Sequence, residues 1–442
     1  MTLGIENGMI VTLDSSARVL ERGHVTISGD LIETVNNEPA AGSDVSDRLD
    51  ASDGVVMPGL LNAHTHSPEN LARGAVDRVA FENWAAVVWP ALDRLAPKEI
   101  RIAVLLGCCE MLRTGTTAVV DHFRQTPMSL AAIEAAVDAY REAGMRFAVA
   151  IMLRDRVMPP WANDVPRVAD VEEMCRAAIV DWHDPAGLGT IMLAPSAPHR
   201  CTDRLLEMVA ALGRERRIHI QMHVDETCTQ RREADETYGH SSIRHLDPIG
   251  LLNDRVSLAH CVWVDDADLD LLAKTATTVV HNPMSNLRLG SGIAPVPAML
   301  DRGIAVALGA DGAASNDSQD MFETMKMASL LQGAIGPAAR PTAHDVLRMA
   351  TGQSGERFGM AGIGGIAAGR KADIVVFERA DARLYPLNDI HRQIVFCGGL
   401  TVRHVVVGGR VVVRDGQIQT FDEKAVYAEA DKLTARYATR SH

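Results

Sequence analysis

Long apolar runs are missing from this 442-residue chain: no stretch reaches the roughly 20 uninterrupted apolar residues that a membrane-spanning helix needs. Its seven cysteines are scattered and form no CxxC pair, a pattern typical of free thiols in a reducing compartment rather than of a disulfide framework. Residues 1–7 show no basic start followed by an apolar core, so no secretory signal is expected. These absences predict a cytoplasmic protein with no membrane partner.

An excess of positive charge is missing as well. The formal net charge is −13, whereas nucleic acids and anionic membranes favour basic surfaces, so no nucleic-acid partner is expected. The GAASND stretch after Asp311 lacks the spacing and the lysine of a phosphate-binding GxxxxGK[ST] loop. A hydrophobic content of 47% and a charged content of 23% are ordinary for a soluble globular protein. The net charge suits a soluble enzyme but selects no substrate, and the partner that we expect is a small-molecule substrate.

The central part of the chain alternates apolar strands with amphipathic helices. Because strands separated by helices run parallel, this order predicts an α/β fold, a TIM-like (β/α)8 barrel. The expected strands are residues 55–62, 117–121, 147–152, 190–194, 219–223, 256–260, 277–281 and 304–309. The expected helices include residues 97–113, 130–143, 171–181, 202–215, 265–273 and 319–331.

Short strands separated by Gly and Asp turns occupy both ends of the chain. They are residues 8–13, 23–27 and 31–35 near the start, and 372–378, 402–407, 410–413 and 417–420 near the end. We expect them to come together as one small β-sandwich domain, followed by a terminal helix over residues 423–440. The expected division is residues 1–56 for the first part of the β domain, 57–362 for the metal-dependent barrel and 363–442 for the rest.

His64-Thr65-His66 directly follows the apolar run at residues 55–63. Side chains alternate along an extended chain, so two histidines one residue apart point to the same face. They can therefore bind one metal ion from the end of a buried strand, and zinc favours imidazole nitrogen. An isolated HxH motif is common by chance, and the case depends on further ligands.

Further residues that can bind a metal or a proton follow other expected strands. In a barrel of this kind, catalytic residues lie at the carboxyl ends of the strands. Taken singly, each could be a hydrogen-bonded core histidine or a turn aspartate, but together they indicate a metal centre. These residues are His223, His260, His281 and Asp311.

Glu226 lies three residues beyond His223, in the segment His223-Val224-Asp225-Glu226-Thr227. A carboxylate beside a metal-bound water can take its proton and later deliver it to a leaving group. The alternatives are a solvated loop glutamate and an acid favoured by a helix N-terminus. Asp225 competes for the same role.

Eight segments occur in an order that resembles the amidohydrolase superfamily, in the branch of methylthioadenosine/S-adenosylhomocysteine deaminases and triazine hydrolases. The resemblance covers about residues 5–420. The segments are MPGLLNAHTH (57–66), LRTGTTAVVD (112–121), APSAPHRCT (194–202), HVDET (223–227), LAHCVWV (258–264), HNPMSNLRLGSGIAPV (281–296), LGADGAASND (308–317) and GRKADIVVF (369–377).

The resemblance implies one divalent metal ion, most often Zn2+, with Fe2+ and Mn2+ as alternatives. It implies that Glu226 carries the proton, that His260 orients the attacking water and that Asp311 also helps to deprotonate it. Binuclear relatives bridge two metals with a modified lysine from a middle strand. The only lysine between His66 and Lys274 is Lys98, on an expected helix, so a single metal is predicted. The implied ligands are His64, His66, His223 and Asp311.

Departures from the nucleoside deaminases concern the substrate. Leu92, Ile151 and Ser196 stand where those enzymes carry a glutamate, an arginine and a histidine that contact the nucleoside. With Trp84 and Trp89, they predict a more apolar cavity that disfavours nucleosides, because a site without polar groups loses its preference for hydroxyls. By resemblance, His281 would also contact the substrate, and the loop 282–292 that follows it would line the pocket.

Several of these residues have other interpretations. Either tryptophan could belong to the core, and His122 and His199 are more typical of structural histidines. Arg154, Arg156 or Arg200 could supply an anionic contact, although surface arginines are commoner.

The leading interpretation is a metal-dependent aminohydrolase, in which a metal-bound hydroxide attacks an amino-substituted nitrogen heterocycle and ammonia leaves. The alternative is a triazine-type hydrolase that displaces chloride or alkylamine, or cleaves a urea or cyclic-amide C–N bond. A non-catalytic barrel serving as a scaffold is disfavoured by the intact set of site residues. Relatives of this kind commonly associate through barrel helices, so a homo-oligomer is expected.

Overall fold

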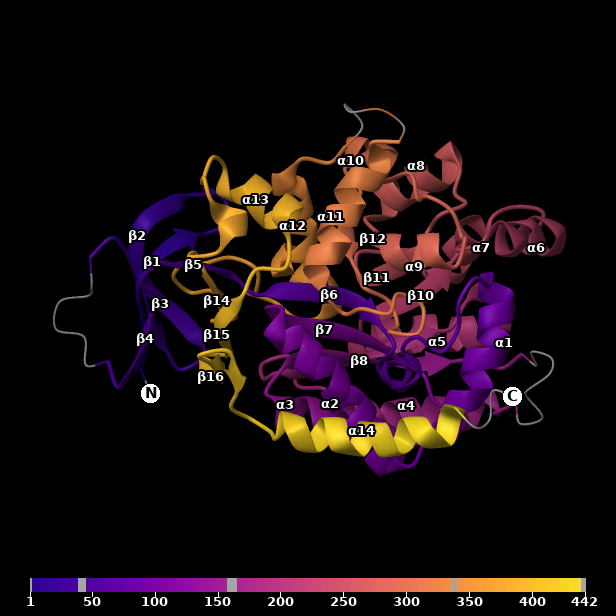
Figure 1. Cartoon of the computed structure of the whole chain (residues 1–442). Helices are drawn as coiled ribbons and strands as arrows, with labels where there is room; N and C mark the ends of the chain where they lie inside the picture. The colour runs from indigo at the N-terminus through magenta and orange to yellow at the C-terminus, as the bar shows by residue number, and fades with distance from the viewer. Residues whose placement is uncertain (1, 39–44, 157–164, 335, 337–339, 439–442) are drawn as a thin grey trace.

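The chain folds into a ring of eight parallel strands and a separate sheet built from its two ends (Figure 1). The computed structural model describes residues 2–38, 45–156, 165–334, 336 and 340–438. The ring is surrounded by helices and the end sheet lies to one side of it. The predicted α/β class with a TIM-like barrel is therefore confirmed.

Each strand of the ring is hydrogen-bonded in parallel to the next one along the chain. The first and last strands meet where the backbone N–H of Asp311 donates to the carbonyl of His64 at 2.8 Å, so the ring is nearly closed. The strands are β6 (Leu60–Thr65), β7 (Thr116–Phe123), β8 (Arg146–Leu153), β9 (Gly189–Pro195), β10 (Ile220–Val224), β11 (Val256–His260), β12 (Thr278–His281) and β13 (Val306–Leu308).

The helices begin and end where local signals predict. In α3 (Leu130–Ala143) the Ser129 side chain accepts from the Ala132 N–H at the start, and Gly144 takes a left-handed conformation, φ 70°, at the end. The predicted helices at 97–113 and 130–143 are confirmed with the same bounds. The other predicted helices are α4 (Val168–Trp182), α5 (Asp203–Arg216), α8 (Asp266–Thr275) and α11 (Met321–Gln332), beside α2 (Pro97–Arg113).

Further helices were not predicted, because they are short or carry weak apolar periodicity. They are α1 (Phe81–Leu92), α6 (Cys228–Tyr238), α7 (Ser242–Ile249), α9 (Pro283–Arg288), α10 (Val296–Asp301), α12 (Ala343–Ala350) and α13 (Ile390–Cys397). Short 3-10 segments complete the connections: η1 (Ser67–Ala72), η2 (Pro198–Arg200), η4 (Gly352–Phe358) and η5 (Ala382–Leu384).

One predicted strand is wrong in its bounds. Residues 55–62 form two strands: β5 (Gly54–Pro58) belongs to the end sheet and β6 to the barrel. Gly59 between them donates its N–H to the Asp373 carbonyl at 3.0 Å, and a Cβ there would lie 2.1 Å from the Thr117 hydroxyl oxygen. The chain can therefore change sheets here, and β6 continues through His64 to Thr65.

Small side chains fill the interior of the barrel. Ala63, Ala118, Ala148, Ala259 and other small residues form a buried cluster there. Larger side chains that follow the last barrel helix pack into the same cluster: Phe358, Met360 and Ile363. The carboxyl ends of the strands are left for polar side chains.

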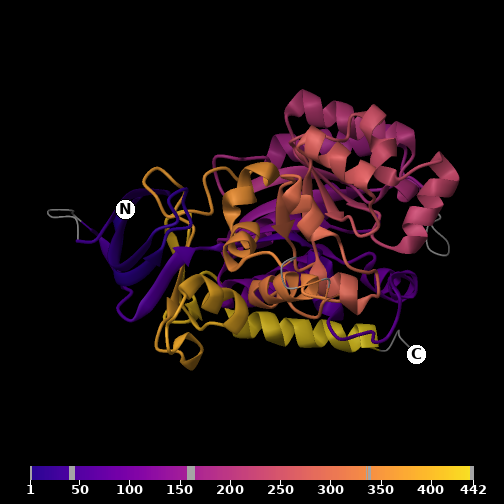
Figure 2. The same ribbon diagram turned by 90° about the horizontal axis from the view of Figure 1, so that it is seen from above.

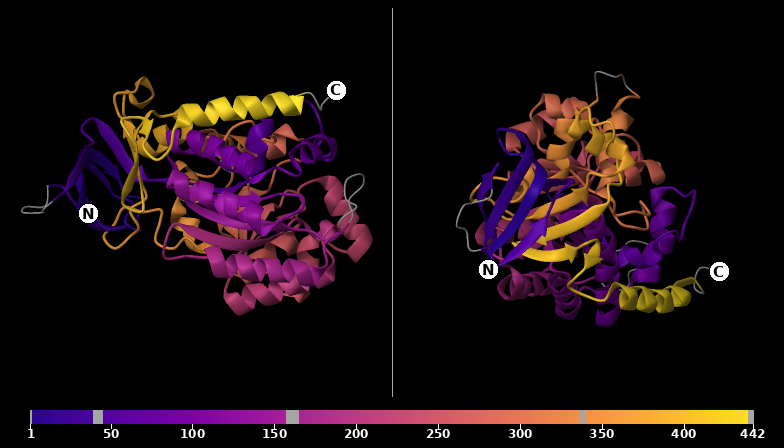
Figure 3. Two further views of the ribbon diagram at one scale, coloured as in Figure 1. Left: turned by 90° about the horizontal axis from the view of Figure 1, so that it is seen from below. Right: turned by 60° about the vertical axis from the view of Figure 1, so that its left-hand side comes forward.

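Nine strands from both chain ends form the second sheet, which confirms the predicted small β domain (Figure 3). β5 and β14 run antiparallel and join the early strands to the late ones. A bidentate ion pair between Arg146 of the barrel and Asp373, at 2.7 and 2.9 Å, links the two sheets. The strands are β1 (Thr2–Val11), β2 (Val19–Ser28), β3 (Leu31–Asn36), β4 (Asp47–Asp50), β5, β14 (Ile374–Glu378), β15 (Val402–Val407), β16 (Arg410–Arg414) and β17 (Gln417–Ile418).

The last helix, α14 (Glu423–Ala438), runs back along the barrel beside α2 (Figures 1 and 2). Arg113 at the end of α2 pairs with Glu423 at the start of α14. The predicted helix over 423–440 is confirmed as far as Ala438; residues 439–440 lie outside the described residues. Among the described helices, none combines the length and the apolar character needed to cross a bilayer.

Candidate active site

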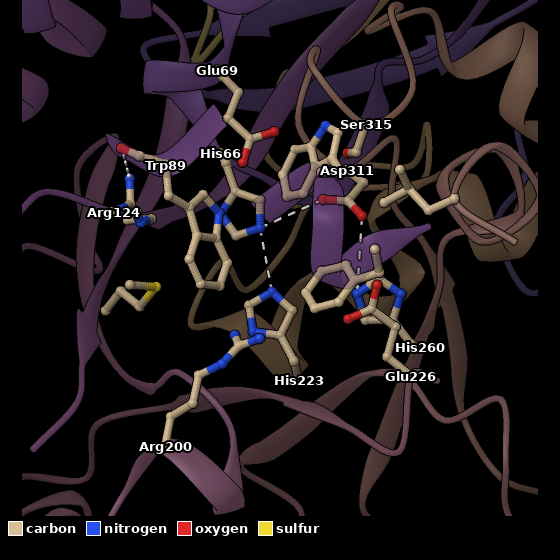
Figure 4. A pocket seen from close by; sticks show the side chains of 14 residues that line it. His66, Glu69, Trp89, Arg124, Arg200, His223, Glu226, His260, Asp311 and Ser315 are labelled. Carbon is tan, nitrogen blue, oxygen red and sulfur yellow. Dashed lines mark hydrogen bonds and ion pairs between the residues drawn. The ribbon is translucent and has the colours of Figure 1, made fainter. Parts of the chain in front are cut away.

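Four side chains from distant parts of the chain converge at the carboxyl ends of the barrel strands. Figure 4 shows His66, His223 and Asp311 of this group. The Nε2 atoms of His66 and His223 lie 3.2 Å apart. Asp311 Oδ1 lies 3.7 Å from His64 Nε2 and 3.5 Å from His66 Nε2. The structure thus brings together the four residues that the sequence predicts as metal ligands.

Hydrogen bonds on the far side of each ring fix its orientation. His64 Nδ1 lies 2.8 Å from Gln221 Oε1, His66 Nδ1 lies 2.7 Å from the His122 carbonyl, and His223 Nδ1 lies 2.6 Å from the Ser196 carbonyl. Each partner is an acceptor, so Nδ1 carries the proton and Nε2 presents a lone pair to the common centre.

This donor set fits a cation. Burial lowers the pKa of His64 to about 3 and also lowers the pKa of His66, so both rings are neutral near pH 7. Neutral imidazole nitrogen is the form that binds metals. Two lone pairs 3.2 Å apart beside a buried carboxylate repel one another unless a positive ion lies among them. Three imidazole nitrogens and one carboxylate oxygen are donors that a divalent ion such as zinc accepts.

His122, interpreted from the sequence as structural, lies close to this centre. It is buried near the end of β7, and one of its ring nitrogens lies within 4.8 Å of donor atoms of His64 and His223. Its backbone carbonyl also accepts from His66. His122 therefore borders the centre through both its ring and its backbone.

His260 and Asp311 have backbone conformations that are rare for residues with side chains, with φ of 74° and 65°. Such conformations cost about 1–3 kcal/mol each and persist where the surroundings enforce them. The Asp311 carbonyl accepts from Thr65 Oγ1 at 3.0 Å and from Gln319 Nε2 at 2.7 Å. His260 Nδ1 lies 2.8 Å from Asn286 Oδ1, and its Nε2 faces Asp311 Oδ2 at 3.9 Å.

Glu226 follows β10 by two residues and is 2% exposed. Burial raises the pKa of its carboxyl, which suits a group that must gain and lose a proton near neutral pH. Its backbone N–H donates to Gln230 Oε1 at 3.0 Å. Asp225, the rival for the same role, accepts instead from Ser242 Oγ at 2.6 Å and does not line the pocket.

A partly enclosed pocket lies against this centre. Three aromatic rings in its wall pack stacked or edge to face, with centroids 6.0 Å apart for Phe81 and Trp84 and 6.4 Å for Trp84 and Trp89. The lining residues are His66, Glu69, Phe81, Trp84, Trp89, Arg124, Met152, Arg200, His223, Glu226, His260, Leu289, Asp311 and Ser315.

Trp84 and Trp89 of the predicted substrate-binding residues line this cavity. Four others are buried outside its lining: Leu92, Ile151, Ser196 and His281. Ser196 contributes through its backbone, since its carbonyl accepts from His223. Of the three arginines left open by the sequence, Arg200 lines the cavity, whereas Arg154 donates to Thr126 Oγ1 at 2.9 Å. The substrate roles of these residues stay predictions.

Leu289 lies in the loop 282–292 that was expected to line the pocket. Sequence reasoning missed other lining residues: Glu69, Phe81, Arg124, Met152 and Ser315. One local signal could have found Glu69. Gly312 follows Asp311, and a Cβ at Gly312 would lie 1.8 Å from Glu69 Oε2, so the glycine makes room for the carboxyl. Burial raises the pKa of Glu69 well above its usual range.

Comparison with known proteins extends these observations. The model of the Amidohydrolase family matches residues 55–412. A 5'-deoxyadenosine deaminase from Methanopyrus kandleri is 35% identical, with 98% of this chain and 100% of that protein covered. A 5-methylthioadenosine/S-adenosylhomocysteine deaminase from Syntrophobacter fumaroxidans is 36% identical over 94% of each chain.

A solved structure, the atrazine chlorohydrolase from Arthrobacter aurescens TC1 complexed with zinc, superposes with a TM-score of 0.91. It is 27% identical, with 98% of this chain and 100% of that chain covered. The chain therefore belongs to the amidohydrolase family, and the predicted resemblance is confirmed.

Proposed function

We propose that this member of the amidohydrolase family removes ammonia from an amino-substituted nitrogen heterocycle, with one zinc ion held by His64, His66, His223 and Asp311. The observation that carries the proposal is the arrangement of three imidazole lone pairs and one carboxylate beside a partly enclosed pocket. Glu226 and His260 line the same pocket.

The predicted enzyme class is confirmed: the protein is a hydrolase acting on carbon–nitrogen bonds other than peptide bonds, and its family depends on a metal. The two relatives described above, each about a third identical, are named as deaminases. A small-molecule substrate agrees with those names.

Each step of the proposed reaction has a residue that can carry it out. A divalent ion in this site would lower the pKa of a water molecule and hold it next to the carbon that is attacked. Glu226 takes a proton as the water attacks, and its raised pKa lets it deliver that proton to the departing amine. His260, oriented by Asn286, positions the attacking oxygen, and Asp311 helps to deprotonate it.

The choice of metal follows from the ligands. Imidazole nitrogen with a single carboxylate favours zinc, and the family neighbour described above is a zinc complex. Iron(II) and manganese(II) are the alternatives. Lys98 is an exposed residue of α2 and not part of a barrel strand, which agrees with a single ion. Metal analysis of the protein as isolated tests this choice, and one equivalent of zinc is expected.

Similarity to an atrazine chlorohydrolase favours one second candidate, displacement of chloride or alkylamine from a triazine. The aromatic side chains of the cavity suit such a ring as well as they suit an aminopurine. The product separates the two activities, because a deaminase releases ammonia and the second candidate releases halide or a substituted amine. Association into a homo-oligomer stays a prediction, which light scattering can check.

The experiment is ammonia release by the zinc-loaded protein across adenosine, 5'-deoxyadenosine, guanine, pterin, cytosine and melamine. Glu226→Gln should retain its metal and lose turnover by at least about 100-fold, the usual contribution of a general acid–base. Glu233→Gln is the matched control, since Glu233 is an exposed acid on α6. Full turnover by the Glu226 variant, or silence across the panel with one metal bound, would refute the proposal.

A further inference from the structure

Arg200 is a buried cation in the cavity wall without a carboxylate partner. Arg200 is 3% exposed and lines the cavity. One terminal nitrogen of its guanidinium donates to Ser196 Oγ at 3.2 Å. Within the described part of the chain its Nε has no hydrogen-bond partner, and no ion pair includes it. A guanidinium has five N–H donors, so most of its hydrogen-bonding capacity is unused.

Two other buried arginines, in contrast, have carboxylate partners. Arg124 lines the same cavity, but it pairs with Asp93 at 2.6 Å and also reaches the Trp89 carbonyl at 3.4 Å. Arg146, buried elsewhere, has its bidentate partner in Asp373. A buried charge without a partner is costly, and natural proteins keep one mainly where something else completes it.

Aromatic contacts hold the Arg200 guanidinium without neutralising it. Its Cζ lies 4.6 Å from the ring centroid of Trp89 and 5.5 Å from that of Phe81. Glu226 attracts this charge across the cavity, yet burial still lowers the pKa of Arg200 to about 10, so the group stays charged near neutral pH. Because Glu226 must carry a proton during the reaction, it cannot serve as a permanent partner.

Figure 4 shows Arg124, Trp89 and Arg200 on one side of the pocket and Asp311 with His260 on the other. We propose that Arg200 binds a negatively charged oxygen of the substrate, whose ring lies against the aromatic side chains and whose amino group faces Glu226. This inference rests on the proposed function and narrows the substrate to amino-heterocycles that carry an acidic group. The oxygen belongs either to a carboxylate substituent or to an acidic ring hydroxyl.

Nicotinate and nicotinamide test the binding directly, because they share a ring and differ by the carboxylate. Quenching of the fluorescence of Trp84 and Trp89 reports their dissociation constants. We expect a preference of roughly 10- to 100-fold for nicotinate, the usual range for a hydrogen bond to a charged group. The measurement is repeated on metal-stripped protein, since a carboxylate that bound only the metal would lose its preference there.

Variants assign the preference to a residue. Arg200→Met should abolish it, and Arg200→Lys, which keeps the charge and loses the planar fork, should retain part of it. Arg154→Met is the matched control: Arg154 is partly buried nearby and does not line the cavity. Equal affinity for the two probes in the wild type, or an unchanged preference in Arg200→Met, overturns the inference. Arg200→Lys, judged by its circular dichroism, serves if the methionine variant fails to fold.

Turnover measurements distinguish a carboxylate from an acidic ring hydroxyl as the source of the oxygen. They also distinguish a failure of this inference from a failure of the proposed function. Pterin-6-carboxylate against pterin tests a carboxylate, and ammelide against melamine tests an acidic ring oxygen. In the preferred pair, kcat/KM for the acidic member should fall roughly 10- to 100-fold in Arg200→Met, with the neutral member nearly unchanged. Nicotinate preference without any turnover would refute the proposed function alone. An unchanged kcat/KM for the acidic member in Arg200→Met would refute this inference alone.

Discussion

Replacing Gln221 by leucine should weaken metal binding without touching a ligand. Gln221 Oε1 accepts from His64 Nδ1 at 2.8 Å, and its Nε2 donates to the Ala63 carbonyl at 3.0 Å. Both side chains are fully buried, so leucine leaves the His64 N–H without an acceptor and without water. An orphaned buried donor costs about 1–3 kcal/mol. The ring can escape that cost only by turning away or by moving its proton to the atom that should bind the metal.

This cost converts to a loss of roughly 10- to 100-fold in metal affinity, which is also the usual effect of removing such a partner. Competition with a chromogenic chelator measures the zinc dissociation constant. Gln332→Leu is the control: Gln332 is a fully buried glutamine in α11 that donates to the Ala294 carbonyl at 3.2 Å, away from the centre. Equal zinc affinity in the Gln221 variant and this control would refute the reasoning.

Four further results are expected. Asn286→Leu removes the acceptor of His260 Nδ1 and should lower kcat about 10- to 100-fold at unchanged metal content, whereas unchanged kcat would show that the ring needs no orientation. Gly312→Ala forces a Cβ against the Glu69 carboxyl and should cost about 1–3 kcal/mol in denaturant unfolding; a wild-type midpoint would contradict the packing. Arg146→Met leaves the buried Asp373 carboxylate without its partner and should lower the free energy of unfolding by about 3–5 kcal/mol in the same assay. A smaller loss is expected only if water reaches the carboxylate. Zinc at 100 times its dissociation constant should stabilise the stripped protein by about 2.7 kcal/mol, seen as a higher Tm; no shift would mean that the ion does not bind the native state.

The barrel was predictable because periodicity and helix-ending signals agree along the chain. Residues 97–113 and 130–143 combine apolar periodicity with local end signals, and the structure reproduces both ranges. The strand at 55–62 was misjudged because all of its residues except Asn62 are apolar. Nothing in the pattern says that Val56 belongs to one sheet and Leu61 to another, since only the contact between Gly59 and Thr117 decides it.

The cluster of His64, His66, His223 and Asp311 was predictable for a similar reason: these residues lie at or just beyond strand ends, where the fold fixes their positions. The residues of the cavity wall were harder to predict from the sequence. Arg124 and Glu69 lie just beyond strand ends, in segments without regular periodicity, and their approach to the cavity depends on contacts with Asp93 and Gly312. Predicted substrate positions such as Ile151 lie on barrel strands but are buried outside the lining, because alignment identifies a strand more reliably than the direction of a side chain.

The pairing of β5 with β14 has a consequence for synthesis on the ribosome. β5 ends at Pro58 and β14 begins at Ile374, so the early strands leave the ribosome about 300 residues before their partner exists. At roughly 5–20 residues per second, that interval lasts about 15–60 s. During that time the apolar edge of β5 is open to wrong strand partners. Nascent chains that end before residue 374 should therefore aggregate or bind chaperones. Bound chaperones should leave the chain when β14 emerges from the ribosome.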